Sequence, residues 1–95
     1  MQLTFEAELW LWDGKASWHF VTVPVEDADE LRDEAAKAPK GFGSVKVQAT
    51  IGKTTWSTSV FPDKASDSYV LPVKALVRKA NQLEAGDIVT VTLVF

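Results

Sequence analysis

The residues of this chain with the clearest capacity to bind a charged ligand lie in its second half. Lys74 and Arg78 are one turn apart on a predicted helix, on the side away from its apolar residues. An arginine presents a fork of N–H donors that matches a carboxylate or phosphate, and a lysine adds a compact positive charge. Lys46, Ser59 and Tyr69 belong to neighbouring predicted strands and could face the same mouth. These five residues form our candidate ligand-binding site, for an anion.

A solvated basic surface is the plainer interpretation of the same pattern, and the one that the pattern favours. Lys74 and Arg78 would then only balance the acidic first predicted helix. The acidic residues of that helix fit no calcium-loop pattern, so a solvated face explains them better than a metal site. They are Asp27, Asp29, Glu30, Asp33 and Glu34. We expect no metal and no cofactor.

Residues for catalysis are scarce. His19 is the only histidine, and the chain has no cysteine. A catalytic dyad would need His19 to meet Ser59 or another hydroxyl through tertiary structure, and nothing in the spacing indicates such a meeting. A single histidine in an apolar strand is typically a packing or rim residue. We therefore expect no catalytic residues and a protein that is not an enzyme.

Four tryptophans are many for a chain of 95 residues. Trp10 and Trp12 fall on the face of the first predicted strand opposite its apolar stripe, so they are candidates for an exposed partner surface. The alternative, which we prefer, is that a helix or the other hairpin covers them. Trp18 and Trp56 are expected to pack in or near the core.

Six strands and two helices must position these residues. Apolar residues alternate with polar ones in the strands, and Asp13-Gly14 and Gly52-Lys53 are typical hairpin turns. The predicted strands are near 3–12, 17–23, 45–51, 54–61, 69–71 and 89–95, and the helices near 26–38 and 72–80. In the first strand, the inward residues are expected to be Leu3, Phe5, Ala7, Leu9 and Leu11.

Each helix has a proline nearby and one apolar face. Pro24 ends the second strand, and Pro72 is expected as the first residue of the second helix, because that position needs no N–H partner. The first helix carries a thin apolar stripe of Ala28, Leu31, Ala35 and Ala38. The second carries Val73, Leu76, Val77 and Ala80, with Asn81 as its C-terminal cap.

A short internal sequence repeat relates the two halves of the chain. Val23-Pro24-Val25 and Leu71-Pro72-Val73 each follow a hairpin and a strand end and precede a helix. Two such units can interlock so that each completes the sheet of the other, which closes a barrel with few free edges. The match is short, so chance is the alternative explanation.

Composition limits the class of protein. The length suits a single domain over residues 1–95, and no apolar run approaches the roughly 20 residues that span a bilayer. The N-terminus lacks the features of a secretory signal, so we expect a cytoplasmic protein with no membrane partner. The formal net charge of −3 argues against nucleic acid, whose binding depends on clustered basic residues.

Several motifs together resemble the family called domain of unknown function 1905. They are the runs Trp56–Pro62, Tyr69–Lys74, Val77–Ala80 and Gly86–Val91, with similarity over nearly the whole chain. The resemblance implies a double-split β-barrel, a fold shared with AbrB-like and MazE-like DNA-binding regulators. In those regulators two chains supply the two halves, whereas in this protein one chain would supply both. The family has no settled activity.

The expected fold is therefore α+β and mainly β: a closed six-stranded double-split β-barrel with two helices, built from two pseudo-repeated halves. The expected function is a small non-enzymatic binding module for an anionic small molecule, peptide or protein partner. A nucleic-acid-binding barrel like the regulators is the first alternative, and an enzyme of unknown reaction is the last. A single-chain barrel has little need to dimerise, so we expect a monomer or weak homodimer.

Overall fold

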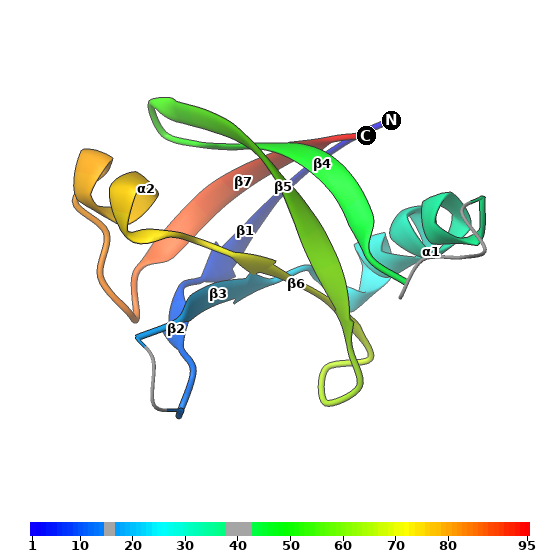
Figure 1. Ribbon diagram of the computed structural model, residues 1–95, viewed down its shortest axis with the longest axis horizontal. Coiled ribbons are helices and arrows are strands. Elements are labelled where there is room, and N and C mark those ends of the chain that lie inside the picture. The colour runs from blue at the N-terminus through cyan, green and yellow to red at the C-terminus, as the bar shows by residue number, and fades with distance from the viewer. Residues whose placement is uncertain (15–16, 38–42) are drawn as a thin grey trace.

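A nearly closed antiparallel β-barrel forms the body of the protein, with helices on two opposite sides (Figure 1). The structure, a computed structural model, describes residues 1–14, 17–37 and 43–95. Its strands are β1 (Gln2–Glu8), β2 (Trp10–Leu11), β3 (His19–Thr22), β4 (Val45–Ile51), β5 (Thr54–Asp63), β6 (Ser68–Pro72) and β7 (Ile88–Val94). The helices are the short 3-10 helix η1 (Val25–Asp27), α1 (Ala28–Ala36) and α2 (Ala75–Ala80). The prediction of a mainly β fold with two α-helices is confirmed.

The strand order around the barrel is β1-β7-β4-β5-β6-β3-β2. Seven strands are present in the described residues instead of the six expected, because the first predicted strand is broken at Leu9. The Leu9 N–H donates to the Asp87 carbonyl (2.8 Å) and its carbonyl accepts from Gly86 N–H (2.7 Å), beside the start of β7. After Leu9 the chain changes partner and β2 pairs with β3. The two strands at the ends of the sheet are therefore consecutive in the chain, which brings the barrel close to closure.

The break at Leu9 also ends the predicted alternation of side chains. Leu3, Phe5 and Leu9 are buried, as expected, and Ala7 is half-buried. Leu11, expected to point inward, is 52% exposed. The prediction for Leu11 is wrong because the strand does not continue with one register through residue 9.

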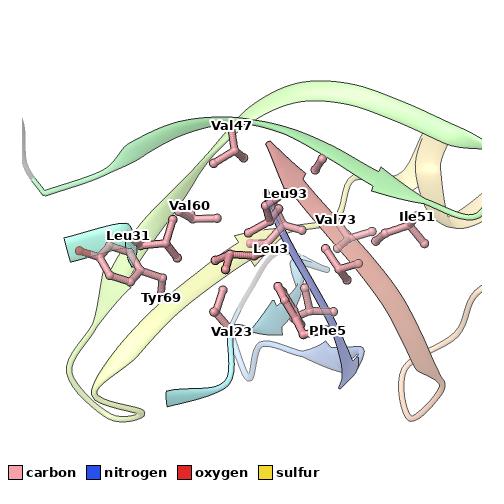
Figure 2. Close-up of a cluster of buried hydrophobic side chains, with 14 of the residues drawn as sticks. Leu3, Phe5, Val23, Leu31, Val47, Ile51, Val60, Tyr69, Val73 and Leu93 are labelled. Carbon is pink, nitrogen blue, oxygen red and sulfur yellow. The ribbon is translucent and has the colours of Figure 1, made fainter. Parts of the chain in front are cut away.

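The core fills the barrel and takes residues from every strand but β2, and from both α-helices. Figure 2 shows Leu31 and Tyr69 at one end of the cluster and Ile51 and Val73 toward the other. The alternation predicted for residues 45–51 is confirmed, since the odd residues of β4 are buried and its even residues lie outside or at the margin. The largest fully buried side chains are Leu9, Leu31, Leu71, Leu93, Val21, Val23, Val60, Val73, Val77 and Val91.

The first helix follows its predicted apolar stripe. Ala28 and Leu31 are buried and Ala35 is half-buried against the core, while Ala38 lies outside the described residues. The helix itself starts at Ala28, after the 3-10 turn that follows Pro24. In the described ranges, no helix is long and apolar enough to cross a membrane.

The second helix begins later than predicted. Pro72 is the last residue of β6, opposite Phe20 of β3, and α2 begins at Ala75 with Lys74 as its N-cap. Because the helix has fewer than two turns, Val77 is its only buried residue. Leu76 is 74% exposed and Ala80 is exposed, so their predicted inward placement is wrong.

The two halves of the chain meet where β3 pairs with β6. Val21 lies opposite Leu71, and the pairing extends to a bond from Val23 N–H to the Tyr69 carbonyl (2.9 Å). The strands of the second half, β4 to β7, are contiguous in the sheet, so the two halves meet only at the β3–β6 and β1–β7 pairings and do not exchange strands. The pseudo-repeat stays a prediction.

Candidate functional site

The sheet opens between β5 and β6. These strands pair only through Phe61–Val70, Pro62–Tyr69 and Asp63–Ser68. Continuing that register would bring Ser59 opposite Pro72, which has no N–H to donate. The ladder therefore ends at Val70, and β6 leaves β5 to lead into α2.

A pocket of about 440 Å³ lies in this opening, and we call it the β5–β6 pocket. Three segments line it: residues 17–19 at the start of β3, residues 56–58 of β5, and residues 72–75 with Arg78 at the start of α2. Its volume falls in the range of about 300–1,000 Å³ that is usual for small-molecule sites. Its wall exposes more apolar than polar surface, although six of its eleven lining residues are polar or charged.

Two positive charges stand at the α2 wall of the pocket. Lys74 is exposed, and Arg78 is half-buried with its Nε donating to the Val73 carbonyl at 3.2 Å. That bond fixes the base of the guanidinium and leaves its two terminal nitrogens for other acceptors. Neither Lys74 nor Arg78 has an acidic partner among the residues that the structure describes. The pocket therefore carries positive charge that the described part of the chain does not neutralise.

Aromatic rings form another part of the wall. Trp18 is 53% exposed and stacks on Phe20 with ring centroids 6.1 Å apart, so its predicted place in or near the core is wrong. The reason is that Trp18 precedes β3 and its ring covers the outside of that strand. Trp56 is half-buried and packs against the core, as predicted. A flat ligand could contact both indoles.

His19 also lines the pocket and is held by its own backbone. Its Nδ1 lies 3.0 Å from the Ser17 carbonyl oxygen, which can only accept. Nδ1 must then carry the proton, which leaves Nε2 as the second polar atom of the ring. In residues 1–14, 17–37 and 43–95 no hydroxyl is bonded to His19, so the structure assembles no His–Ser dyad there.

The predicted ligand-binding residues fall into three places. Lys74 and Arg78 lie together in the β5–β6 pocket. Lys46 and Ser59 are cross-strand neighbours on the outer face of β4 and β5, in a shallower hollow that shares Ser57 and Thr58 with the pocket. Tyr69 is only 4% exposed and belongs to the core, so it does not line the pocket. The single five-residue site is thus not assembled as one surface.

The first two tryptophans differ from each other. Trp12 is 50% exposed, whereas Trp10 is half-buried, with its ring 5.2 Å from that of Phe20 and its Nε1 donating to Thr22 Oγ1 at 2.9 Å. Trp10 is therefore a structural residue of the β2–β3 surface, and Trp12 is the more exposed of the two.

The acidic helix shows no metal-binding arrangement. No group of three or more carboxylates and histidines is placed to hold a metal ion in the described part of the chain. Asp29 is instead paired with Arg32 (2.9 Å), on the exposed face. At the start of the helix, burial raises the pKa of Asp27, and the nearby charges of Glu26 and Glu30 raise it further.

Three pocket residues were missed by the sequence reasoning. Trp18 and Trp56 were expected to pack in or near the core, and His19 to be a packing or rim residue, because each lies in a β-rich stretch. One signal could have found them: a proline at the end of a strand, which cannot continue the ladder and so opens the sheet beside it. Pro72 is that residue.

The family model described as domain of unknown function (DUF1905) matches residues 5–93 of the 95-residue chain. No curated protein matches the sequence.

Proposed function

Because this chain belongs to the DUF1905 family, whose function is unknown, we propose its function from the pocket: it is a small non-enzymatic module that binds an anionic ligand. One observation carries the proposal. Lys74 and Arg78, without acidic partners in the described residues, open onto the same 440 Å³ pocket as Trp18 and Trp56. The ligand class is a carboxylate or phosphate attached to a flat apolar body.

The chemistry of the wall supports this ligand class. The terminal nitrogens of Arg78 can donate two parallel bonds to one anionic group, and Lys74 adds charge beside it. An indole offers a face for offset stacking with an aromatic or planar group. Both kinds of contact are available within one pocket, so a ligand that has only one of them should bind less tightly.

The overall charge does not oppose such binding. The chain has a net charge of −3, but charges more than about 8–10 Å away are largely screened at physiological ionic strength. The acidic residues of α1 lie on the side of the barrel opposite α2 (Figure 1). Lys74 and Arg78 line the pocket and no carboxylate of the described residues does, so the affinity for an anion should fall as salt is added.

Binding, and not catalysis, is proposed because the described residues of the pocket wall do not pair a nucleophile with a base. His19 is tied to Ser17 through Nδ1, and Ser57 and Thr58 are hydroxyls without a base beside them in the described residues. General acid–base or nucleophilic catalysis needs a second positioned group.

Single-stranded nucleic acid is the second candidate. Exposed indoles beside basic side chains can stack bases and hold phosphates, and Lys46 lies in the adjoining hollow. A mobility-shift titration with oligothymidine at low salt tests this candidate. Absence of binding there would remove it.

Isothermal titration calorimetry with 2-naphthoate tests the first proposal, with uncharged 2-naphthylmethanol as the matched ligand. The double variant K74E/R78E should weaken naphthoate binding at least tenfold and leave the weaker alcohol binding nearly unchanged. The control variant K53E/K64E makes the same charge change at two exposed turn residues outside the pocket. Equal naphthoate affinity in the two double variants would contradict the proposal.

A further inference from the structure

One edge of β5 has no partner strand along the wall of the β5–β6 pocket. Residues 54–60 of β5 pair with β4 alone, and the pairing with β6 is confined to residues 61–63. Ser57 and Ser59 lie in this one-sided stretch, and Ser57 lines the pocket. The direction of their backbone groups decides what the pocket can hold.

The β4–β5 hairpin sets that direction. Its two-residue turn, Gly52-Lys53, is flanked by the pair Ile51–Thr54, and in such hairpins the flanking pair is hydrogen-bonded. Bonded and non-bonded pairs then alternate, so Trp56 and Thr58 bond to β4. Thr55, Ser57 and Ser59 direct their N–H and C=O groups away from β4, toward β6.

Opposite them, β6 lacks the N–H donor that would continue the ladder. The Tyr69 carbonyl accepts from Val23 and the Val73 N–H donates to His19, so the odd residues of β6 face β3. Val70 and Pro72 therefore face β5. Val70 completes a pair with Phe61, but Pro72 has no N–H to bond the Ser59 carbonyl.

The edge of β5 that carries the outward backbone groups of Ser57 and Ser59 thus has no paired strand in the described residues. Backbone N–H and C=O groups are obligatory hydrogen-bonding groups, and an unpaired strand edge is a template for another strand. A pocket that contains such an edge together with aromatic and basic side chains can select its ligand more narrowly than an anion site alone.

We propose that the ligand is an extended peptide segment that adds to the free edge of β5 and places a carboxylate on Lys74 and Arg78. This inference rests on the proposed function, and names its ligand class. Main-chain bonds to Ser57 and Ser59 supply the recognition of the backbone, as in other cases of strand addition. The charge complementarity of Lys74 and Arg78 selects the carboxylate.

The carboxylate could be the C-terminus of the peptide or an acidic side chain, since both present the same two oxygens to Arg78. The apolar part of the segment would lie against Trp18 or Trp56. A peptide of three or four residues with β-branched and aromatic side chains meets all these requirements. Acetyl-Thr-Val-Thr-Phe with a free C-terminal acid is therefore our probe.

Calorimetric titration of the probe is combined with an N-methyl scan, in which one amide at a time is methylated. Strand addition predicts a period of two: methylation at the positions that face β5 abolishes binding, and methylation at the alternate positions lowers affinity less than threefold. In amide hydrogen exchange, Ser57 and Ser59 should exchange rapidly in the free protein and at least tenfold more slowly in the complex.

Three probe peptides separate the sources of the carboxylate. If the free-acid peptide binds at least tenfold more tightly than its C-terminal amide, the terminal carboxylate is the group bound. If acetyl-Thr-Val-Glu-Phe-amide binds as tightly as the free acid, an acidic side chain serves equally, which also supports the inference. In either case K74E/R78E should remove the preference.

The outcomes distinguish this inference from the proposed function. Naphthoate binding that depends on Lys74 and Arg78, together with peptide binding that shows no period of two, would overturn strand addition and leave the anion site. Absence of both naphthoate and peptide binding would overturn both proposals. Peptide binding with unchanged exchange at Ser57 and Ser59 would also overturn the inference, because the segment would then lie elsewhere.

Discussion

Asn81 at the end of α2 accepts a hydrogen bond from the backbone N–H of Lys53, in the turn of the β4–β5 hairpin, at 2.9 Å. Its Nδ2 also donates to Thr54 Oγ1 and to the Val77 carbonyl, both at 2.9 Å. One side chain thus caps α2 and joins it to the hairpin, which are the two elements on either side of the β5–β6 pocket. Asn81 was predicted only as a helix cap.

Replacing Asn81 with alanine should lower the free energy of unfolding by about 2 kcal/mol, because three hydrogen bonds, two of them part-buried, are lost together. The measurement is urea unfolding at 25 °C followed by circular dichroism. Lys79→Ala, at an exposed position of the same helix, is the control and should change stability by less than about 0.5 kcal/mol. Equal values for the two variants would show that the tether adds nothing.

Trp18→Ala should weaken binding of 2-naphthoate about tenfold with little effect on folding. The ring is 53% exposed and stacks on Phe20 at the surface. The substitution therefore mainly removes a surface of the pocket that a ligand would contact. Stacking of a planar group on an aromatic side chain contributes about 1–3 kcal/mol. Calorimetry and urea unfolding of the same preparation measure both quantities.

Trp10→Ala is the matched control for Trp18→Ala, because it also removes an indole that contacts Phe20. It loses the bond to Thr22 and the half-buried ring, so it should lower stability more than Trp18→Ala and weaken naphthoate binding less. The reverse order of the two effects would contradict the assignment of Trp18 to the pocket.

Much of the fold was predictable because it depends on alternation over several residues. The clear period of two in residues 45–51 predicted β4 with the correct bounds and buried face. Where one residue changes the partner of a strand, periodicity gave no warning. Leu11 continues the alternation of apolar residues from Leu3, which fits one continuous strand. The hydrogen bonds of Leu9 to Asp87 and Gly86 instead break the strand before Leu11.

The pocket was harder to predict because it depends on where a ladder stops. That Lys74 and Arg78 lie together was predictable, since their spacing is local to one segment. Tyr69 lies apart from them, because its position on β6 alternates with Val70 and its side chain points into the core. Trp18 and His19 reach the pocket only through the pairing of β3 with β6, which is a contact between residues about 50 apart in sequence.

Asp27→Asn should stabilise the protein slightly at neutral pH. Burial and the neighbouring charges of Glu26 and Glu30 raise the pKa of Asp27 in the folded state above its ordinary value of 3.8, despite its place at the N-terminus of α1, where negative charge is favoured. The folded state then holds the proton more tightly than the unfolded state. Stability is gained as the pH falls through the folded pKa and lost as it rises.

The asparagine removes that penalty, so the variant should be slightly more stable than the native protein at pH 7, and the gain should vanish below pH 3.8, where both states are protonated. Urea unfolding between pH 3 and pH 7 measures it. Asp33→Asn, on the exposed face of the same helix, removes an equal charge and serves as the control. A gain that persists at pH 3, or one equal in both variants, would show that the raised pKa of Asp27 is not its source.

Pro72→Ala should close part of the β5–β6 pocket. The alanine restores an N–H on the side of β6 that faces β5, where the Ser59 carbonyl lies next in register. A new hydrogen bond adds about 0.5–1.5 kcal/mol to stability, while loss of the proline ring costs about 0.4–1 kcal/mol through the unfolded state. The free energy of unfolding should therefore change by less than about 1 kcal/mol. The main effect of the substitution should be on binding of the probe peptide.

In this variant the amide of residue 72 should be protected from exchange, and the probe peptide should bind at least tenfold more weakly, because its place on the β5 edge is taken. Pro24→Ala is the control, since Pro24 precedes η1 and lies outside the pocket. A Pro72→Ala protein with an unprotected amide at residue 72 and undiminished peptide binding would mean that the proline does not hold the sheet open, and that β5 and β6 diverge because α2 packs on the barrel through Val77.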